Sequence, residues 1–148
     1  MARRAWLRLF PAHFARRAEP SPRELGLLGE RLAARHLRRA GWRVLARRLR
    51  TARGEVDILA SRGAQLACVE VKTARVRSLE APPDPRTRPG RRYDRARWRR
   101  QRAAARLLHA EPPRLDLVEV WIERGSGRWR AVHHKGSPDA RGPTFFQP

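Results

Sequence analysis

The sequence contains one cysteine, Cys68, among its 148 residues. A single thiol excludes an internal disulfide and any zinc site built on pairs of cysteines. Because Cys68 lies in an apolar segment, we expect it to be a small buried side chain. The sequence also has no apolar run close to the roughly 18 residues that span a bilayer, so we expect no membrane-spanning segment.

Acidic residues are scarce as well: 14 Asp and Glu stand against 35 Lys and Arg, which gives a formal net charge of +21. So many like charges repel one another in a folded chain, and a polyanion relieves the repulsion. Each phosphate contact also releases condensed counterions, so nucleic acid, and DNA in particular, is the expected partner. An anionic membrane surface and ribosomal RNA are the alternatives. We expect a cytoplasmic protein that is able to associate with the nucleoid.

Lysine is nearly absent, because only Lys72 and Lys135 are found among the 35 basic residues. The chain uses arginine wherever a positive charge suffices. Lys72 closes the run 69–72, of sequence Val-Glu-Val-Lys. An ammonium is a compact charge that can shift its pKa and act on a water or phosphate oxygen, whereas a guanidinium stays protonated. The exception at Lys72 therefore indicates a chemical role.

The length is sufficient for one domain with a single buried core. We expect residues 1–20 to form a flexible basic arm, although their composition is also that of an organellar transit peptide. Residues 21–135 form the expected domain, and residues 136–148 are expected to be a loosely attached tail.

Local patterns predict seven elements in the order α-β-β-β-α-β-β. Ser21 and Glu24 form a capping box with proline at the first helical position, and Gly41 supplies the C-terminal stop. A helix is therefore expected from residue 22 to about residue 40. Short segments rich in β-forming residues and separated by turns predict strands. These segments are 42–49, 55–60, 66–72, 115–122 and 129–133.

The middle of the chain has a different character. Residues 73–92 are rich in proline and arginine and have no periodicity, so they predict a long loop. A second helix is expected to begin at Asp94, as its N-cap, and to reach about His109. The predicted order places a mixed sheet between two helices, which is an α/β fold.

Two acids and the exceptional lysine are expected to meet on this sheet. Residues i and i+2 of a strand share a face, so Glu70 and Lys72 point the same way. In the preceding strand, Asp57 takes one face and both Val56 and Ile58 take the other. If the two strands pair through a short turn, Asp57 can lie near Glu70 with Lys72 beside them.

Adjacent carboxylates repel unless a cation joins them, and Mg²⁺ or Mn²⁺ suits such an oxygen-rich pair. The metal would polarise a phosphoryl oxygen and lower the pKa of a bound water, while Lys72 would orient that water or stabilise the developing charge. The alternative is a solvated sheet face with an ordinary cross-strand ion pair.

Glu30 is a third candidate acid. At about 100° per residue, it falls inside the apolar stripe of the first predicted helix. Burying a bare carboxylate is costly, so Glu30 needs a partner. The partner is either an arginine, in a buried ion pair, or the metal site, which Glu30 would reach over the sheet directly or through water.

The second predicted helix carries a basic cluster that we expect to contact phosphates, with an ordinary solvated face as the alternative. The cluster comprises Arg95, Arg97, Arg99, Arg100 and Arg102. Trp98 lies among these arginines and is the best candidate among the tryptophans to stack on an unpaired base.

Other polar and aromatic side chains are given structural roles. Trp42 and Trp121 are expected in the core, and Asp116 is expected to satisfy a strand-edge group or to pair with an arginine. His133 and His134 are adjacent on a strand and therefore point to opposite faces. We expect them to be a surface pair rather than metal ligands.

Taken together, several segments resemble the YraN family of small bacterial proteins. The segments are Gly29-Glu30, Gly41, 54–60, 69–72 and 114–118. The resemblance covers about residues 25–134 and implies a restriction-endonuclease-like fold similar to that of archaeal Holliday junction resolvases. It implies that the three acids and the lysine of a PD-(D/E)XK nuclease centre are Glu30, Asp57, Glu70 and Lys72. Gln101 matches a glutamine common in the family.

The chain departs from the family pattern after the lysine, where Thr73 and Ala74 precede Arg75, and in its basic loop and N-terminal arm. The first hypothesis is a metal-dependent endonuclease that cuts branched or single-stranded DNA with Mg²⁺ or Mn²⁺. Cutting a junction would require a two-fold homodimer. The second hypothesis is a non-catalytic nucleic-acid-binding protein on the same fold, in which the acids form structural pairs.

Overall fold

The computed structural model describes residues 20–80, 88–92, 95–109, 111 and 113–136. Most of the predicted arm, most of the predicted tail and Asp94 lie outside these residues. Within them, the element order is α3, β1, β2, β3, η1, α4, β4 and β5. The predicted α/β class and order are confirmed, with one added element, the 3-10 helix η1.

Helix α3 (Pro22–Arg39) has the predicted boundaries. The Ser21 hydroxyl accepts a hydrogen bond from the N–H of Glu24, and the Glu24 carboxylate accepts one from the N–H of Ser21 at 2.9 Å. After the helix, Gly41 has a φ of 82°, a left-handed conformation that glycine adopts without strain. The apolar face of α3 packs on the sheet through buried residues that include Leu28, Leu32 and Leu37.

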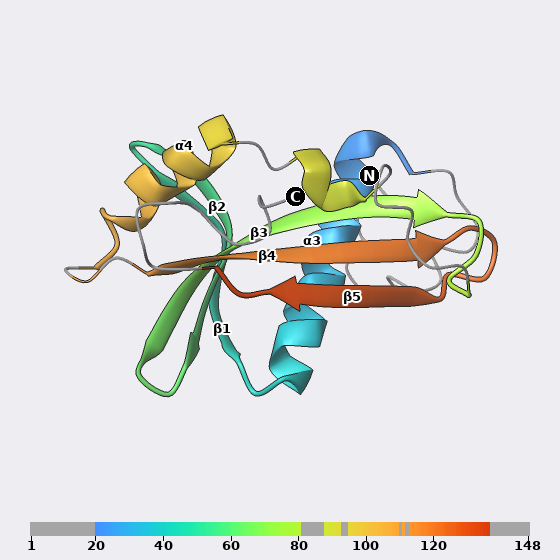
Figure 1. Ribbon diagram of the computed structural model, residues 1–148, viewed down its shortest axis with the longest axis horizontal. Helices are drawn as coiled ribbons and strands as arrows, with labels where there is room; N and C mark the ends of the chain where they lie inside the picture. The colour runs from blue at the N-terminus through green and yellow to red at the C-terminus, as the bar shows by residue number, and fades with distance from the viewer. Residues whose placement is uncertain (1–19, 81–87, 93–94, 110, 112, 137–148) are drawn as a thin grey trace, which may run out of the picture.

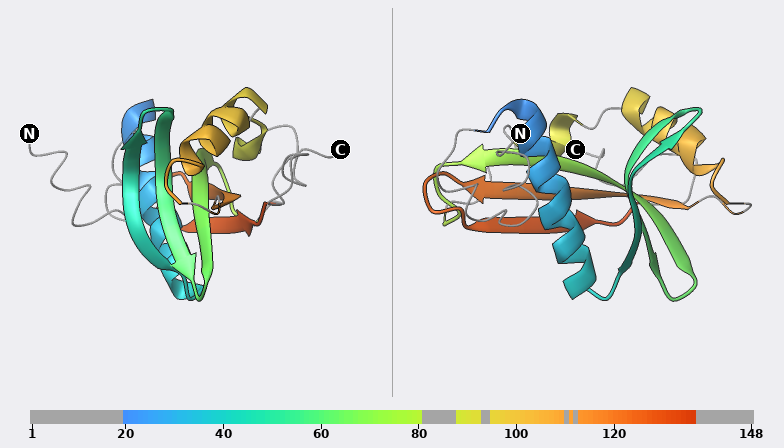
Figure 2. Two further views of the ribbon diagram at one scale, coloured as in Figure 1. Left: turned by 90° about the vertical axis from the view of Figure 1, so that its left-hand side faces the viewer. Right: turned by 180° about the vertical axis from the view of Figure 1, so that it is seen from behind.

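Five strands form one sheet in the order β1-β2-β3-β4-β5. Their bounds are β1 Arg43–Thr51, β2 Gly54–Arg62, β3 Gln65–Val76, β4 Arg114–Glu123 and β5 Trp129–His134. Only β3 and β4 pair in parallel, and the other neighbours are antiparallel, so the sheet is mixed as predicted. Helix α3 covers one face, while η1 (Pro89–Arg92) and α4 (Arg95–Ala105) lie over the other (Figures 1 and 2).

Strand β3 pairs with β2 on one side and with β4 on the other, and its ladder with β2 is the shorter of the two, which opens a fork in the sheet. Its ladder with β2 ends at the pair Ile58 and Val69. Its ladder with β4 runs from Ala67 to Val76. Beyond Val69, β3 therefore continues along β4 while β2 turns toward α4 (Figure 1). On the β2 side, the backbone of β3 after Val69 has lost its ladder partner.

The prediction that residues 73–92 form one loop was wrong at both ends. Residues 73–76 continue β3, and residues 89–92 form η1. The strand is longer than predicted because β4, which lies more than 40 residues further along the chain, supplies the backbone hydrogen bonds for residues 73–76. Residues 81–87 lie outside the described part. At the other helix, α4 ends at Ala105 rather than near His109.

The two faces of β2 do not alternate as predicted. Ile58 packs with the cluster under α3, whereas Val56 packs with Cys68 and Trp98 under α4, so Val56 and Ile58 take opposite faces. The backbone explains the change. Arg48, between the β1 residues that pair with Ile58 and Val56, has a left-handed φ of 52°. This local twist falls at Asp57 and turns its carboxylate toward the fork.

Several single-residue expectations hold in the core. Trp42 and Trp121 are each 3% exposed, and Cys68 is fully buried, as predicted. Burial raises the pKa of the Cys68 thiol to about 12. None of the described helices is long and apolar enough to cross a membrane.

Candidate functional site

The fork between β2 and β3 brings Asp57 and Glu70 together. The N–H of Val71, which β2 no longer engages, donates a hydrogen bond of 2.9 Å to Oδ2 of Asp57. Glu70 lies next to Val71 on β3 and is fully buried, and Asp57 is 7% exposed. The side chain of Asp57 thus replaces a missing ladder partner, and in doing so it is fixed beside a second carboxylate.

Two cations from different elements contact this acidic pair. Nζ of Lys72, on the same face of β3 as Glu70, lies 2.7 Å from Oε1 of Glu70. Arg97 extends from α4, and its Nε donates to the same Oε1 at 3.0 Å. Its Nη2 lies 3.8 Å from Oδ1 of Asp57. The expected grouping of Asp57, Glu70 and Lys72 is therefore present, with Arg97 as a fourth member that bridges the two acids.

One carboxylate oxygen of the pair has no hydrogen-bond partner. Oε2 of Glu70 is buried and makes no hydrogen bond to any residue that the structure describes. A buried carboxylate oxygen without a partner is costly, and a divalent cation is a ligand that would satisfy it. By this criterion the donor set fits Mg²⁺ or Mn²⁺.

Glu30 lies at the edge of this group. Its pKa is raised to about 7, first because α3 half-buries the carboxyl and then because the Asp57 carboxylate is near. Among the described residues, Glu30 forms no salt bridge with an arginine, although the charges of Arg48 and Arg47 partly offset the rise. The predicted buried ion pair is therefore absent in that part of the chain.

The three acids do not form one compact ligand set. In the described part of the chain, no three His, Cys, Asp or Glu side chains lie close enough together to hold a metal. The structure pairs Asp57 with Glu70 and keeps Glu30 within electrostatic range, so direct ligation by Glu30 is not assembled in this conformation. This geometry is compatible with the other form of the prediction, in which Glu30 contacts the metal through a water molecule.

The pKa of Asp57 is raised to about 6 because the carboxyl is buried and lies beside Glu70; the Val71 N–H and Arg97 oppose the rise. For an acid with a raised pKa, the folded state holds a proton that the unfolded state releases near pH 4. Without metal, the contribution of Asp57 and Glu30 to stability should therefore fall as pH rises from about 4 to about 7. Thermal unfolding followed by circular dichroism in a chelator tests this.

Two variants test this pH dependence. Glu30→Gln should reduce the loss of stability with rising pH, because glutamine does not titrate. Glu111→Gln replaces an exposed acid and should leave the pH dependence of stability unchanged. His36 has a pKa lowered by burial, and its contribution to stability rises with pH. Its contribution is common to all three proteins and cancels in the comparison. Identical pH profiles for wild type and Glu30→Gln would contradict the raised pKa of Glu30.

A second charged group lies on the same face of the sheet, and no local pattern predicts it. Glu119 of β4 lies beside Lys72 in the parallel register and is almost fully buried. It accepts hydrogen bonds from Arg88 at 2.5 Å and from the N–H of Gly90 at 2.8 Å, and contacts His134 at 2.8 Å. These partners lower its pKa to about 2. Glu119 thereby anchors η1 to the sheet next to the fork.

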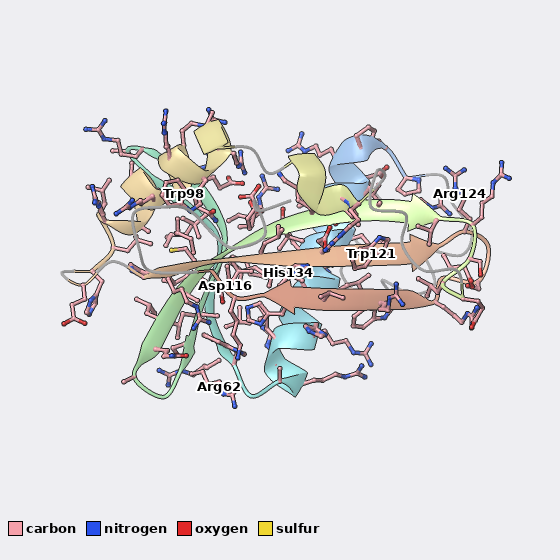
Figure 3. All side chains as sticks on the ribbon, viewed as in Figure 1. Arg62, Trp98, Asp116, Trp121, Arg124 and His134 are labelled. Carbon is pink, nitrogen blue, oxygen red and sulfur yellow. The ribbon has the colours of Figure 1, made fainter. Side chains whose placement is uncertain are left out.

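Helix α4 does not present all its predicted nucleic-acid-binding residues outward. Trp98 is 8% exposed and packs under the helix, so in this structure the indole is not presented to a base (Figure 3). The small side chains of α4 bring the helix close to the sheet and bury this indole. Gln101 is also buried, at 3% exposure. Arg99 and Arg100 are exposed, and Arg102 lies over the Trp98 ring at 5.2 Å.

The side chain of Arg95 lies outside the described part, so its predicted phosphate contact is not tested. Exposure of Arg99 and Arg100 is compatible with phosphate contact and also with an ordinary solvated face. Arg97 differs from both, because it points at the acids of the fork rather than outward.

The two histidines are not the surface pair that was predicted. His133 contacts Oδ2 of Asp116 at 2.7 Å, and His134 contacts Glu119 on the other face. Each histidine therefore satisfies a buried carboxylate of the neighbouring strand β4. Asp116 also pairs with Arg114 and accepts from the N–H of Gly136 at 3.0 Å, as predicted for it. Asp116 and His134 lie close together on the neighbouring strands β4 and β5 (Figure 3).

Comparison with known proteins gives a family match that includes the residues of the fork. A family model described as uncharacterised protein family UPF0102 matches residues 29–120. A UPF0102 protein from Parafrankia sp. is 40% identical over 118 residues, which cover 76% of this chain and 94% of the relative. One from Symbiobacterium thermophilum is 39% identical over 66% of this chain and 82% of the relative. One from Rhizorhabdus wittichii is 58% identical over 48 residues, which are 32% of this chain and 41% of that protein.

Proposed function

We propose that this chain, which belongs to UPF0102, the YraN family, is a nucleic-acid-binding endonuclease that hydrolyses DNA phosphodiester bonds with a divalent metal ion. The observation that carries the proposal is the buried pair of Asp57 and Glu70 at the fork, with the Glu70 oxygen that no described residue satisfies. The fold that we propose is the restriction-endonuclease-like fold, which the resemblance to the YraN family implies.

The residues divide the chemistry between them. Asp57 and Glu70 would hold Mg²⁺ or Mn²⁺, and the metal would supply a polarised phosphoryl oxygen and a water of lowered pKa. Lys72, whose ammonium is anchored 2.7 Å from Glu70, would orient the attacking water or stabilise negative charge on the phosphoryl group. Glu30 would support the metal through water. The formal charge of +21 would draw the polyanionic substrate to the site.

Replacing Lys72 tests this division directly, and the only other lysine provides the matched control. Lys72→Ala should reduce Mn²⁺-dependent cleavage of single-stranded or branched DNA by about 100-fold or more, because one preorganised charge at the reacting group is lost. Lys135→Ala removes an equal charge from an exposed position and should leave the rate within about twofold. A chelator should abolish cleavage by the wild-type protein.

Equal cleavage by Lys72→Ala and wild type would show that the activity belongs to a contaminant and would overturn the assignment. Lys72→Arg distinguishes charge from shape: if a compact ammonium is needed, arginine should restore little of the lost rate.

A second candidate is non-catalytic nucleic-acid binding on the same fold. It is favoured by the contacts of Lys72 and Arg97 with Glu70, because these cations already compensate the acid without a metal. This alternative predicts salt-sensitive DNA or RNA binding that is the same with Mn²⁺ and with a chelator. Calorimetric titration with Mn²⁺ separates the two candidates, since only the nuclease should bind the ion at the fork.

A further inference from the structure

Arg97 occupies the space between the two acids of the fork. Its guanidinium reaches Oε1 of Glu70 with Nε at 3.0 Å and approaches Oδ1 of Asp57 with Nη2 at 3.8 Å. One cation thus touches both carboxylates that the proposed function assigns to a metal. A guanidinium placed between two carboxylates stands in for the divalent ion that would join them.

The charges at the fork cancel in this arrangement. The two carboxylates of Asp57 and Glu70 carry two negative charges, and Lys72 and Arg97 carry two positive charges. A divalent ion that entered with both cations in place would leave an excess of two positive charges in a largely buried site. Such an excess is strongly unfavourable where the effective dielectric constant is low. Metal binding therefore requires one of the two cations to withdraw.

Arg97 is the cation that is placed to withdraw. Lys72 belongs to the same strand as Glu70, two residues further along β3, and its side chain is 21% exposed. Arg97 belongs to α4, on the other side of the fork, and its side chain is 38% exposed. A guanidinium also matches a phosphate group with two parallel hydrogen bonds, which a single carboxylate oxygen of Glu70 does not offer. A nucleic-acid phosphate near α4 would compete with Glu70 for this side chain.

We propose that Arg97 is a tethered counter-ion that closes the divalent-ion site in the free protein and opens it when a nucleic-acid phosphate takes over its guanidinium. This inference rests on the proposed function, because it assigns regulation to the same site. It makes metal binding and nucleic-acid binding cooperative. By linkage, each should raise the affinity for the other by the same factor. A free protein regulated in this way is a poor metal binder and does not cut until it is on its substrate.

Mn²⁺ affinity of the full chain, measured by calorimetry without nucleic acid, tests the closing contact. Arg97→Gln should bind Mn²⁺ about tenfold more tightly than wild type, because the competing charge is gone. Arg99→Gln removes an equal charge from an exposed position on the same helix and should change the affinity less than about twofold. Circular dichroism confirms that each variant is folded.

The opening step is tested on the wild-type protein, so the test does not depend on the variant. A phosphorothioate single-stranded oligodeoxynucleotide resists cleavage and is added before the Mn²⁺ titration. It should raise the Mn²⁺ affinity of wild type about tenfold and that of Arg97→Gln by much less. The oligonucleotide titrated alone with Mn²⁺ supplies the background.

The outcomes separate this inference from the proposed function. If wild type and Arg97→Gln bind Mn²⁺ equally, and Asp57→Asn does not bind it, the metal site stands and the counter-ion role of Arg97 is overturned. Weaker binding by Arg97→Gln also overturns it, since the arginine would then support the site. If no protein in the series binds Mn²⁺, with or without the oligonucleotide, both the metal site and the coupling are overturned.

Discussion

Replacing Asp57 by asparagine should abolish Mn²⁺ binding at the fork and reduce Mn²⁺-dependent DNA cleavage by about 1,000-fold or more, since a metal that stabilises transition-state charge contributes several kcal/mol. The substitution keeps the shape of the side chain. The asparagine oxygen can still accept the N–H of Val71, which Oδ2 of Asp57 accepts at 2.9 Å. Calorimetric titration with Mn²⁺ and a gel assay of cleavage on the same preparation measure the two effects.

The same substitution should make the metal-free protein more stable at neutral pH. Burial and the Glu70 carboxylate raise the pKa of Asp57 to about 6, so the ionised form is disfavoured in the folded state. Asparagine carries no charge at any pH, and its thermal midpoint at pH 7.5 should exceed that of wild type. Loss of activity with a gain in stability is the combination expected of a functional carboxylate. A destabilised and inactive Asp57→Asn would indicate a structural role instead.

A non-catalytic protein would give a different result. If Asp57 and Glu70 serve only as structural partners of Lys72 and Arg97, Asp57→Asn should leave nucleic-acid affinity and its salt dependence unchanged, and Mn²⁺ should not bind to either protein. The metal titration, run also on Arg97→Gln, in which no guanidinium competes for the site, therefore decides between the two candidate functions even where no substrate has been found.

Local patterns in the sequence predicted the first helix and the positions of the acids. The helix was predictable because its capping box, its apolar stripe and Gly41 all lie within the segment itself. Glu70 and Lys72 were placed on one face because strand alternation is a local property. A meeting of two acids then required only a short turn between neighbouring strands, and here residues 63 and 64 connect β2 to β3.

The remaining features depend on contacts between distant segments. The fork exists because β2 leaves β3 after Val69, while β4, on the other side of β3, stays paired as far as Val76, and neither β2 nor β3 carries a signal for that departure. The twist at Arg48 moves Val56 to the other face, and no local pattern in β1 or β2 predicts it. The contact of Arg97 with the acids depends on the rotation of α4 over the sheet. In a chain with so many arginines, no pattern singles out the one that faces inward.

The largest effect on stability is expected at Asp116, in the other charged group of β4. Its carboxylate is fully buried, accepts from Arg114 at 2.7 Å and 2.9 Å, and accepts from the N–H of Gly136 at 3.0 Å. These bonds overcome the cost of burial and hold the pKa of Asp116 below its ordinary value. Asp116→Ala should lower the free energy of unfolding by about 3 kcal/mol or more, because it leaves buried donors without an acceptor. Urea unfolding at pH 7 measures the loss.

A double-mutant cycle shows whether the pair with Arg114 accounts for that loss. Arg114 lies over the Trp42 ring at 5.5 Å, so Arg114→Met keeps apolar contact with the ring while removing the charge. The double variant Asp116→Ala/Arg114→Met should cost less than the sum of the single variants by about 1 kcal/mol or more, since the unpaired guanidinium is then gone. Strict additivity would assign the stabilisation to His133 and Gly136. Glu111→Ala, at an exposed acid, should change stability by less than about 0.5 kcal/mol.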